Sequence, residues 1–116
     1  MKTAVIGSRT LMFLDLSEYI PSDTTLIISG GAKGVDSLAE EYARQKGIPT
    51  QIFRPDYQRY GKKAPLIRNR EIVSACDRLI ALWDGQSRGT QYTIHCARSA
   101  GKEVRIYRLN EMGRRG

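Results

Sequence analysis

The stretch LIISGGAKGVDSLAEEYARQKG, residues 26–47, decides the fold. An apolar run ends at two adjacent glycines, and a third glycine follows three residues later. Apolar residues then recur with helical spacing, at Val35, Leu38, Ala39, Tyr42 and Ala43. This pattern predicts a strand, a tight glycine turn and an amphipathic helix. It also raises a question: which group approaches the backbone of this turn so closely that glycines, which have no side chain, are required there?

The same alternation recurs along the chain. The β-rich runs are residues 2–7, 25–29, 49–54, 77–83 and 103–107, and the helix candidates lie near residues 10–20, 33–46, 64–76 and 89–100. The strand runs are continuously apolar, as expected when helices cover both faces of a parallel sheet. Alternating strands and helices predict an α/β, Rossmann-like three-layer domain with five parallel strands. Members of this class have the strand order 3-2-1-4-5.

Length and composition are those of one globular domain. The chain has 116 residues, of which 41% are hydrophobic and 27% are charged, and this is enough to form a core without metal or disulfides. We expect the domain to span residues 1–108 and residues 109–116 to form a disordered basic tail. No apolar run approaches the roughly 20 residues of a membrane span, and no signal peptide is evident, so a cytoplasmic location is expected. Cys76 and Cys96 lack the spacing of a metal site.

The formal charge of +7 is unevenly distributed. Residues 54–70 contain six Lys or Arg residues against Asp56 alone, and residues 98–116 contain six against Glu103 and Glu111. Such clusters favour an anionic partner, from nucleotide phosphates to nucleic acid. The alternative is a charge that serves solubility, together with a frayed basic tail.

The segments that follow the strands carry the chemistry. In a parallel sheet the carboxyl ends of the strands meet at one edge, where ligands bind. The segments at this edge are GSR (7–9), SGGAKG (29–34), the basic loop 55–65 leading to Arg68 and Asn69, and DGQSRGT (84–90). Glycines, hydroxyls and arginines therefore converge on one rim from four separate turns.

This convergence predicts an anion site. Helix N-termini present unpaired amides to phosphates, and glycines keep Cβ atoms away from the anion. Arg9 and Arg68 can add charge-assisted hydrogen bonds. The spacing is neither that of a P-loop nor that of a dinucleotide fingerprint. The expected ligand-binding residues are Gly7, Ser8, Arg9, Ser29, Gly30, Gly31, Lys33, Gly34, Asp36, Asn69, Trp83, Asp84, Ser87, Gly89 and Thr90, and the catalytic candidates are Arg68 and Asp84.

Three of these residues have two interpretations. Asp36 caps the helix or accepts a hydrogen bond from a ribose hydroxyl. Asp84 faces the ligand, or it forms a turn or a helix cap. Trp83 stacks on a base or packs in the core.

Four segments carry a resemblance to a known family: VIGSR, IISGGAKGVDSLAEEYA, IRNREIVSACDRLIALWDGQSRGTQYTI and AGKEVRIY. They resemble the SLOG superfamily of Rossmann-like nucleotide-binding proteins, especially its small YpsA-related bacterial and phage branch, a domain of unknown function. The resemblance covers residues 2–107. More distantly, the chain is similar to the DNA-processing protein DprA. It is also similar to the LOG phosphoribohydrolases, which split nucleoside 5′-monophosphates into base and ribose 5-phosphate.

The comparison with the LOG group implies a partly retained site. Arg68 matches the group's arginine, nine residues before Asp77, and Asn69 replaces its lysine. Gly89 and Thr90 match its second glycine motif, but Thr93 occupies the position of its catalytic glutamate. A threonine supplies no negative charge to an oxocarbenium-like transition state, so a surviving activity needs another acid, for which Asp84 is the candidate.

The leading interpretation is a protein that binds a nucleotide or nucleotide derivative as a ligand sensor or carrier. One alternative is a LOG-like N-glycosidic hydrolase with an atypical acid, and a second is a nucleic-acid-binding accessory protein. No cofactor is firmly implied, although Mg²⁺ accompanying a bound phosphate stays open. Self-association is expected, with the small residues Ala97 and Ala100 allowing close approach.

Overall fold

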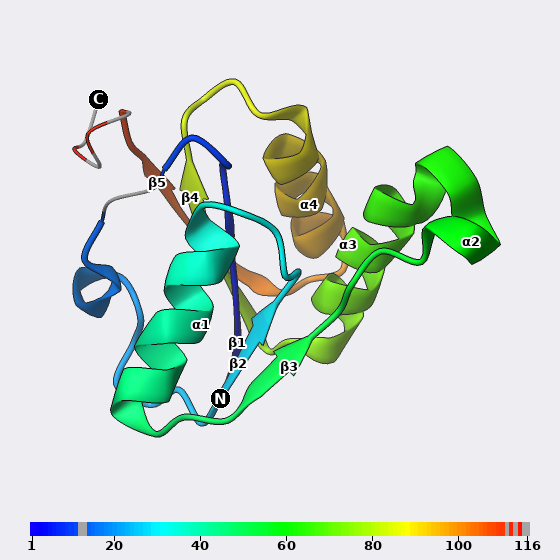
Figure 1. The fold of residues 1–116 in the computed structure, drawn as a ribbon. Coiled ribbons are helices and arrows are strands. Elements are labelled where there is room, and N and C mark those ends of the chain that lie inside the picture. The colour runs from blue at the N-terminus through cyan, green and yellow to red at the C-terminus, as the bar shows by residue number, and fades with distance from the viewer. Residues whose placement is uncertain (12–13, 111, 113, 115–116) are drawn as a thin grey trace.

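The computed structural model describes residues 1–11, 14–110, 112 and 114. Five parallel strands form one sheet in the order β3-β2-β1-β4-β5. They are β1 (Lys2–Gly7), β2 (Leu26–Ser29), β3 (Thr50–Ile52), β4 (Arg78–Trp83) and β5 (Glu103–Arg108). The helix α1 (Val35–Lys46) covers one face, and α3 (Ala64–Ala75) and α4 (Arg88–Ser99) cover the other (Figure 1). The predicted fold class and strand order are confirmed.

The central strands contribute to two cores. Val5 of β1 packs in the cluster beneath α1, whereas its neighbours Ala4 and Ile6 pack in the cluster beneath α3 and α4. In β4, likewise, Ile80 and Leu79 belong to opposite clusters. Successive side chains of a strand point to opposite faces, and both faces are covered here. This is why the strand sequences are continuously apolar.

The helix ends follow the expected signals. Gly47 ends α1 at φ 70° and Gly101 follows α4 at φ 73°, both in the left-handed region that glycine tolerates. Ser87 caps α4, because its side chain accepts a hydrogen bond from the Thr90 amide. These boundaries place the first turns of α1 and α4 at the carboxyl edge of the sheet.

The helix predicted near residues 10–20 is wrong. The described residues of this segment contain the short 3₁₀ helix η1 (Leu16–Glu18). The Asp15 carboxylate accepts hydrogen bonds from the backbone amide and the hydroxyl of Ser17, so the turn begins at residue 15. A side chain that binds nearby backbone groups offers the chain an alternative to a continuous helix. Leu11 is also fully buried before that turn begins.

The basic loop after β3 contains two short elements that the sequence did not indicate. They are α2 (Tyr57–Tyr60) and the 3₁₀ helix η2 (Gly61–Lys63). The Asp56 side chain caps α2 by accepting a hydrogen bond from the Arg59 amide. Together these elements form a basic projection at the side of the molecule (Figure 1), which we call the basic arm and define as residues 54–63.

Two further expectations concern the end of the chain and self-association. Of the predicted tail, residues 111, 113, 115 and 116 lie outside the described residues, whereas Leu109 is buried and donates its backbone N–H to Trp83 O. Ala97 is fully buried against the sheet, so the prediction that it lies at a contact with a second copy is wrong. Ala100 is exposed. Among the described residues, no helix is long and apolar enough to cross a bilayer.

Candidate functional site

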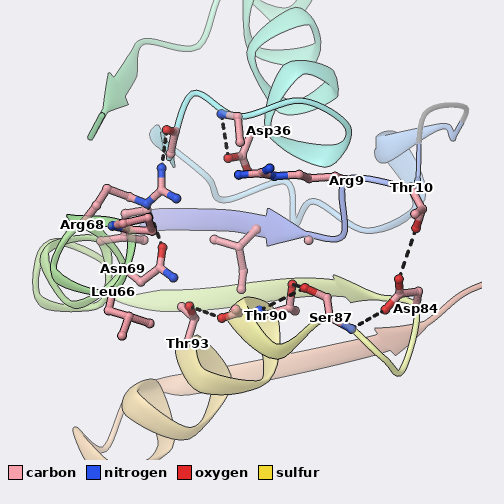
Figure 2. A pocket seen from close by; sticks show the side chains of 17 residues that line it. Arg9, Thr10, Asp36, Leu66, Arg68, Asn69, Asp84, Ser87, Thr90 and Thr93 are labelled. Atoms are coloured by element: carbon pink, nitrogen blue, oxygen red, sulfur yellow. Dashed lines mark hydrogen bonds between the residues drawn. The ribbon is translucent and has the colours of Figure 1, made fainter. Parts of the chain in front are cut away.

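A pocket of about 380 Å³ opens at the carboxyl edge of the sheet (Figure 2). It lies where the chain order reverses, since β1 is flanked by β2 on one side and β4 on the other. Ligands of open α/β sheets bind at such a switch point. The pocket is lined by Ile6, Gly7, Arg9, Thr10, Gly30, Ala32, Asp36, Pro65, Leu66, Arg68, Asn69, Ile72, Asp84, Ser87, Gly89, Thr90 and Thr93.

Arg68 explains why the turn after β2 lacks a side chain. Its guanidinium is buried, and Nη1 donates to Gly30 O at 2.6 Å while Nε donates to Asn69 Oδ1 at 2.8 Å. A Cβ on residue 30 would lie 2.6 Å from Arg68 Nη1. Burial lowers the pKa of Arg68, and the nearby Asp36 carboxylate opposes that effect. The guanidinium remains charged at neutral pH.

Asp36 places a carboxylate at the same end of the pocket. It lies in the first turn of α1, is 7% exposed, and Oδ2 accepts a hydrogen bond from the Ala32 amide at 3.0 Å. Burial raises the pKa of Asp36, although the Ala32 amide and the Arg68 charge act in the opposite direction. The Asp36 carboxylate therefore occupies the backbone amide of the turn after β2 that a ligand anion would otherwise bind.

Asp84 fixes the loop after β4. Its Oδ1 accepts the amides of Gln86 and Ser87, each at 2.8 Å, and its Oδ2 accepts the Thr10 hydroxyl at 3.2 Å. Partial burial acts to raise the pKa of Asp84, but these hydrogen bonds outweigh it and hold the pKa below its ordinary value. The carboxylate thus links the loop after β1 to the loop after β4.

The first turn of α4 forms the other wall. Thr90 and Thr93 are both buried, and Thr93 Oγ1 donates to Gly89 O at 2.8 Å. A Cβ on Gly89 would meet no heavy atom within 4 Å. The first turn of α4 contains no acidic residue. This helix end is consequently open to the pocket and carries the partial positive charge of a helix N-terminus.

Six of the residues predicted to bind ligand do not line the pocket: Ser8, Ser29, Gly31, Lys33, Gly34 and Trp83. The hydroxyls of Ser8 and Ser29 accept backbone amides, from Asp84 at 3.0 Å and from Gly31 at 3.4 Å. Trp83 Nε1 donates to Ser87 O at 3.0 Å and so supports the loop after β4.

The other three residues, Gly31, Lys33 and Gly34, belong to the turn between β2 and α1. Lys33 is exposed, and the Gly31 carbonyl accepts a hydrogen bond from Arg54. Gly34 has φ 77°, and a Cβ there would lie 2.8 Å from backbone atoms of Ser8 and Arg9. Glycine at position 34 therefore allows the turns after β1 and β2 to touch.

Several lining residues were missed, namely Ile6, Thr10, Ala32, Pro65, Leu66 and Ile72. For α3 a signal was present: Pro65, Arg68, Asn69 and Ile72 lie at i, i+3, i+4 and i+7, on one helical face. The prediction that Arg68 lies in the site could therefore have been extended to Pro65 and Ile72, which share its face of the helix. Leu66 is 42% exposed at the pocket, and no periodicity distinguishes it.

The described residues offer no group of three His, Cys, Asp or Glu side chains arranged to hold a metal ion. Asp36 and Asp84 are the carboxylates that line the pocket.

Comparisons with known proteins identify the family. Residues 14–60 match the family model described as the YspA, cpYpsA-related SLOG family. The chain is also 39% identical over 85 residues to the Gene 61 protein of Mycobacterium phage D29, and the alignment covers 68% of each chain. No solved structure matches it significantly. The chain belongs to the YspA, cpYpsA-related SLOG family.

Proposed function

We propose that the chain binds a nucleotide or nucleotide derivative in this pocket and acts as a ligand sensor or carrier. The observation that carries the proposal is one pocket, at the switch point of the sheet, that combines the open first turn of α4 with Arg9 and Arg68. Its volume lies within the range of small-molecule sites. Membership of the SLOG family is consistent with a nucleotide-related ligand.

The phosphate is proposed to lie against the first turn of α4, at Gly89 and Thr90. Arg9 lines the pocket and is exposed, and among the described residues its side chain makes no hydrogen bond or salt bridge. It is therefore free to contact a phosphate. Pro65 and Leu66, in the first turn of α3, contribute an apolar surface to the pocket lining that suits a base.

The hydrolase alternative receives less support. Thr93 is buried in the pocket wall, and its hydroxyl is used by Gly89 O. Asp84 is occupied by two backbone amides and the Thr10 hydroxyl. Neither residue offers the unengaged carboxylate that would stabilise an oxocarbenium-like charge.

Thermal denaturation with a panel of nucleoside mono-, di- and cyclic phosphates tests the proposal. We expect at least one nucleotide to raise the melting temperature at millimolar concentration and to be recovered intact by chromatography. Arg9→Ala should weaken binding by roughly tenfold, the typical effect of losing one charge-assisted contact. Arg98→Ala is the matched control, because Arg98 is an exposed arginine in the last turn of α4 and outside the pocket lining.

Absence of any shift across the panel would contradict the proposal. Free base in the chromatogram would establish the hydrolase alternative instead.

A further inference from the structure

The two glycine turns of the pocket differ in what occupies them. At the turn between β2 and α1, a Cβ on Gly30 would lie 2.6 Å from Arg68 Nη1 and 3.0 Å from Asp36 Oδ2. The space beside this backbone is therefore filled by a guanidinium and a carboxylate of the protein itself, as Figure 2 shows for Arg68 and Asp36.

The Asp36 carboxylate takes the position of an anion in this turn. It is 93% buried, because its exposed fraction is 7%, and it accepts the Ala32 amide. A ligand phosphate at this turn would compete for that amide and face a buried like charge at short range. Arg68 provides no surplus charge, because it is engaged with Gly30 O and lies in the field of Asp36.

The turn before α4 differs at the helix itself. A carboxylate, Asp84, also lies before this helix, but it accepts the amides of Gln86 and Ser87 and the Thr10 hydroxyl. The first helical turn of α4 has no acidic residue, the space beside Gly89 is open, and no carboxylate among the described residues accepts the Gly89 amide. The pocket therefore has a carboxylate on each side, but Asp36 lies in the first turn of its helix, whereas the first turn of α4 leaves an amide for a ligand anion.

We infer that Asp36 is a specificity-determining residue, which accepts hydroxyl groups of the ligand and excludes a second phosphate from the β2–α1 turn. The inference rests on the proposed nucleotide pocket and narrows its ligand class. The ligand carries its phosphate at one end, against α4, and presents hydrogen-bond donors, such as sugar hydroxyls, at the other. A carboxylate accepts hydrogen bonds from two hydroxyls without rearrangement, whereas it repels a phosphate.

Calorimetric titration with ribose 5-phosphate and ribose 1,5-bisphosphate tests the inference without knowledge of the base. We expect the wild-type protein to bind ribose 5-phosphate at least roughly tenfold more tightly than the bisphosphate, because the second phosphate would face Asp36. Asp36→Asn keeps the shape and an oxygen acceptor for the Ala32 amide but removes the charge. In this variant the preference should fall to about threefold or less.

Glu40→Gln is the matched control. Glu40 lies one turn further along α1 and does not line the pocket, so this variant removes the same charge from the same helix. We expect it to retain the wild-type preference, which would exclude an effect of net charge.

The outcomes separate this inference from the proposed function. Equal wild-type affinity for the two sugars, or the same preference in Asp36→Asn as in the wild type, would overturn the role of Asp36 while nucleotide binding stands. The wild-type affinities for the two sugar phosphates test the role of Asp36 even if Asp36→Asn does not fold. Binding of nucleotides without binding of either sugar phosphate would also overturn it, since the phosphate would not be the anchoring group. A protein that binds neither sugars nor nucleotides would refute both proposals.

Discussion

At the scale of single residues, two of the glycines that line the pocket, Gly30 and Gly89, should respond to the same substitution in opposite ways. Gly30→Ala would place a methyl group 2.6 Å from Arg68 Nη1, and so displace the guanidinium and break its bond to the Gly30 carbonyl. We expect a loss of about 1–3 kcal/mol in the free energy of unfolding. Gly89→Ala meets no atom within 4 Å and should leave stability unchanged or raise it by up to about 1 kcal/mol.

Ligand affinity should not follow stability in this pair. The methyl group of Gly89→Ala would project into the open space of the proposed phosphate site, so this variant should bind nucleotide more weakly although its stability is unchanged or higher. Urea denaturation and calorimetry on both variants measure the two quantities. A Gly89→Ala protein that binds as tightly as the wild type would show that the phosphate does not contact this turn.

Asp36 should also leave a signature in the pH dependence of stability. Burial raises the pKa of Asp36 above its ordinary value of 3.8, so the folded state holds this proton more tightly than the unfolded state. The contribution of the group to stability therefore falls as pH rises above 3.8, until the pH passes the folded pKa. Asp36→Asn lacks this titration.

We therefore expect the free energy of unfolding of the wild type, measured relative to Asp36→Asn, to decrease as pH rises from about 3.5 towards neutrality. The lowered pKa of Asp84 acts in the opposite direction, but it is common to both proteins and cancels in the difference. Urea denaturation across that pH range provides the measurement. A difference that increases with pH would mean that Asp36 is stabilised as a carboxylate in the fold.

At the scale of elements, the sequence predicted most accurately the strands and helices that have a clear hydrophobic pattern. The run KTAVIG became β1 with its predicted bounds, and the amphipathic face that begins at Val35 became α1. The segment near residues 10–20 failed because its apolar residues are nearly continuous and Asp15 redirects the backbone. Helix α2 has four residues, which is too few for a helical period to be recognised.

The candidate site shows the same limit. Because the strand ends of a parallel sheet converge, the four turns could be placed together from sequence. The contact between Arg68 and Gly30 spans 38 residues of sequence, and the pairing of a helical arginine with one particular carbonyl depends on tertiary packing. Both glycine turns were assigned the same anion-binding role from the sequence, and their different surroundings, a buried guanidinium at Gly30 and open space at Gly89, became apparent in the structure.

The loop between β4 and α4 should depend on Asp84 for its conformation. Asp84→Ala removes the acceptor of the Gln86 and Ser87 amides, and we expect it to lower the free energy of unfolding by about 1 kcal/mol. Asp84→Asn retains an oxygen acceptor and should lose less than half as much. Thermal and urea denaturation compare the two variants. Equal destabilisation would mean that the charge, rather than the hydrogen-bond geometry, holds the loop.

At the scale of the whole molecule, the basic arm raises the question of whether the partner is a nucleotide or a nucleic acid. Arg59, Lys62 and Lys63 are exposed on the arm, and Arg59 lies over the Tyr60 ring at 5.2 Å. The arm residues Arg54, Arg59, Lys62 and Lys63 do not line the pocket. A ligand confined to the pocket would therefore leave most of this charge unused, whereas a nucleic acid would need it.

Ionic strength separates these two partners. A ligand with one phosphate in the pocket should lose less than about tenfold in affinity between roughly 50 and 200 mM salt, because it neutralises few charges. A nucleic acid making six or more phosphate contacts would lose about 10³-fold or more over that range. A calorimetric salt series with the tightest nucleotide of the panel, and with a single-stranded oligonucleotide, measures both dependences. Replacing Lys62 and Lys63 together by Gln should leave nucleotide affinity within about twofold, since both are exposed, neither lines the pocket and salt screens exposed charges. A steep salt dependence for the oligonucleotide that disappears in this double variant would instead assign the basic arm to a nucleic-acid surface, separate from the pocket.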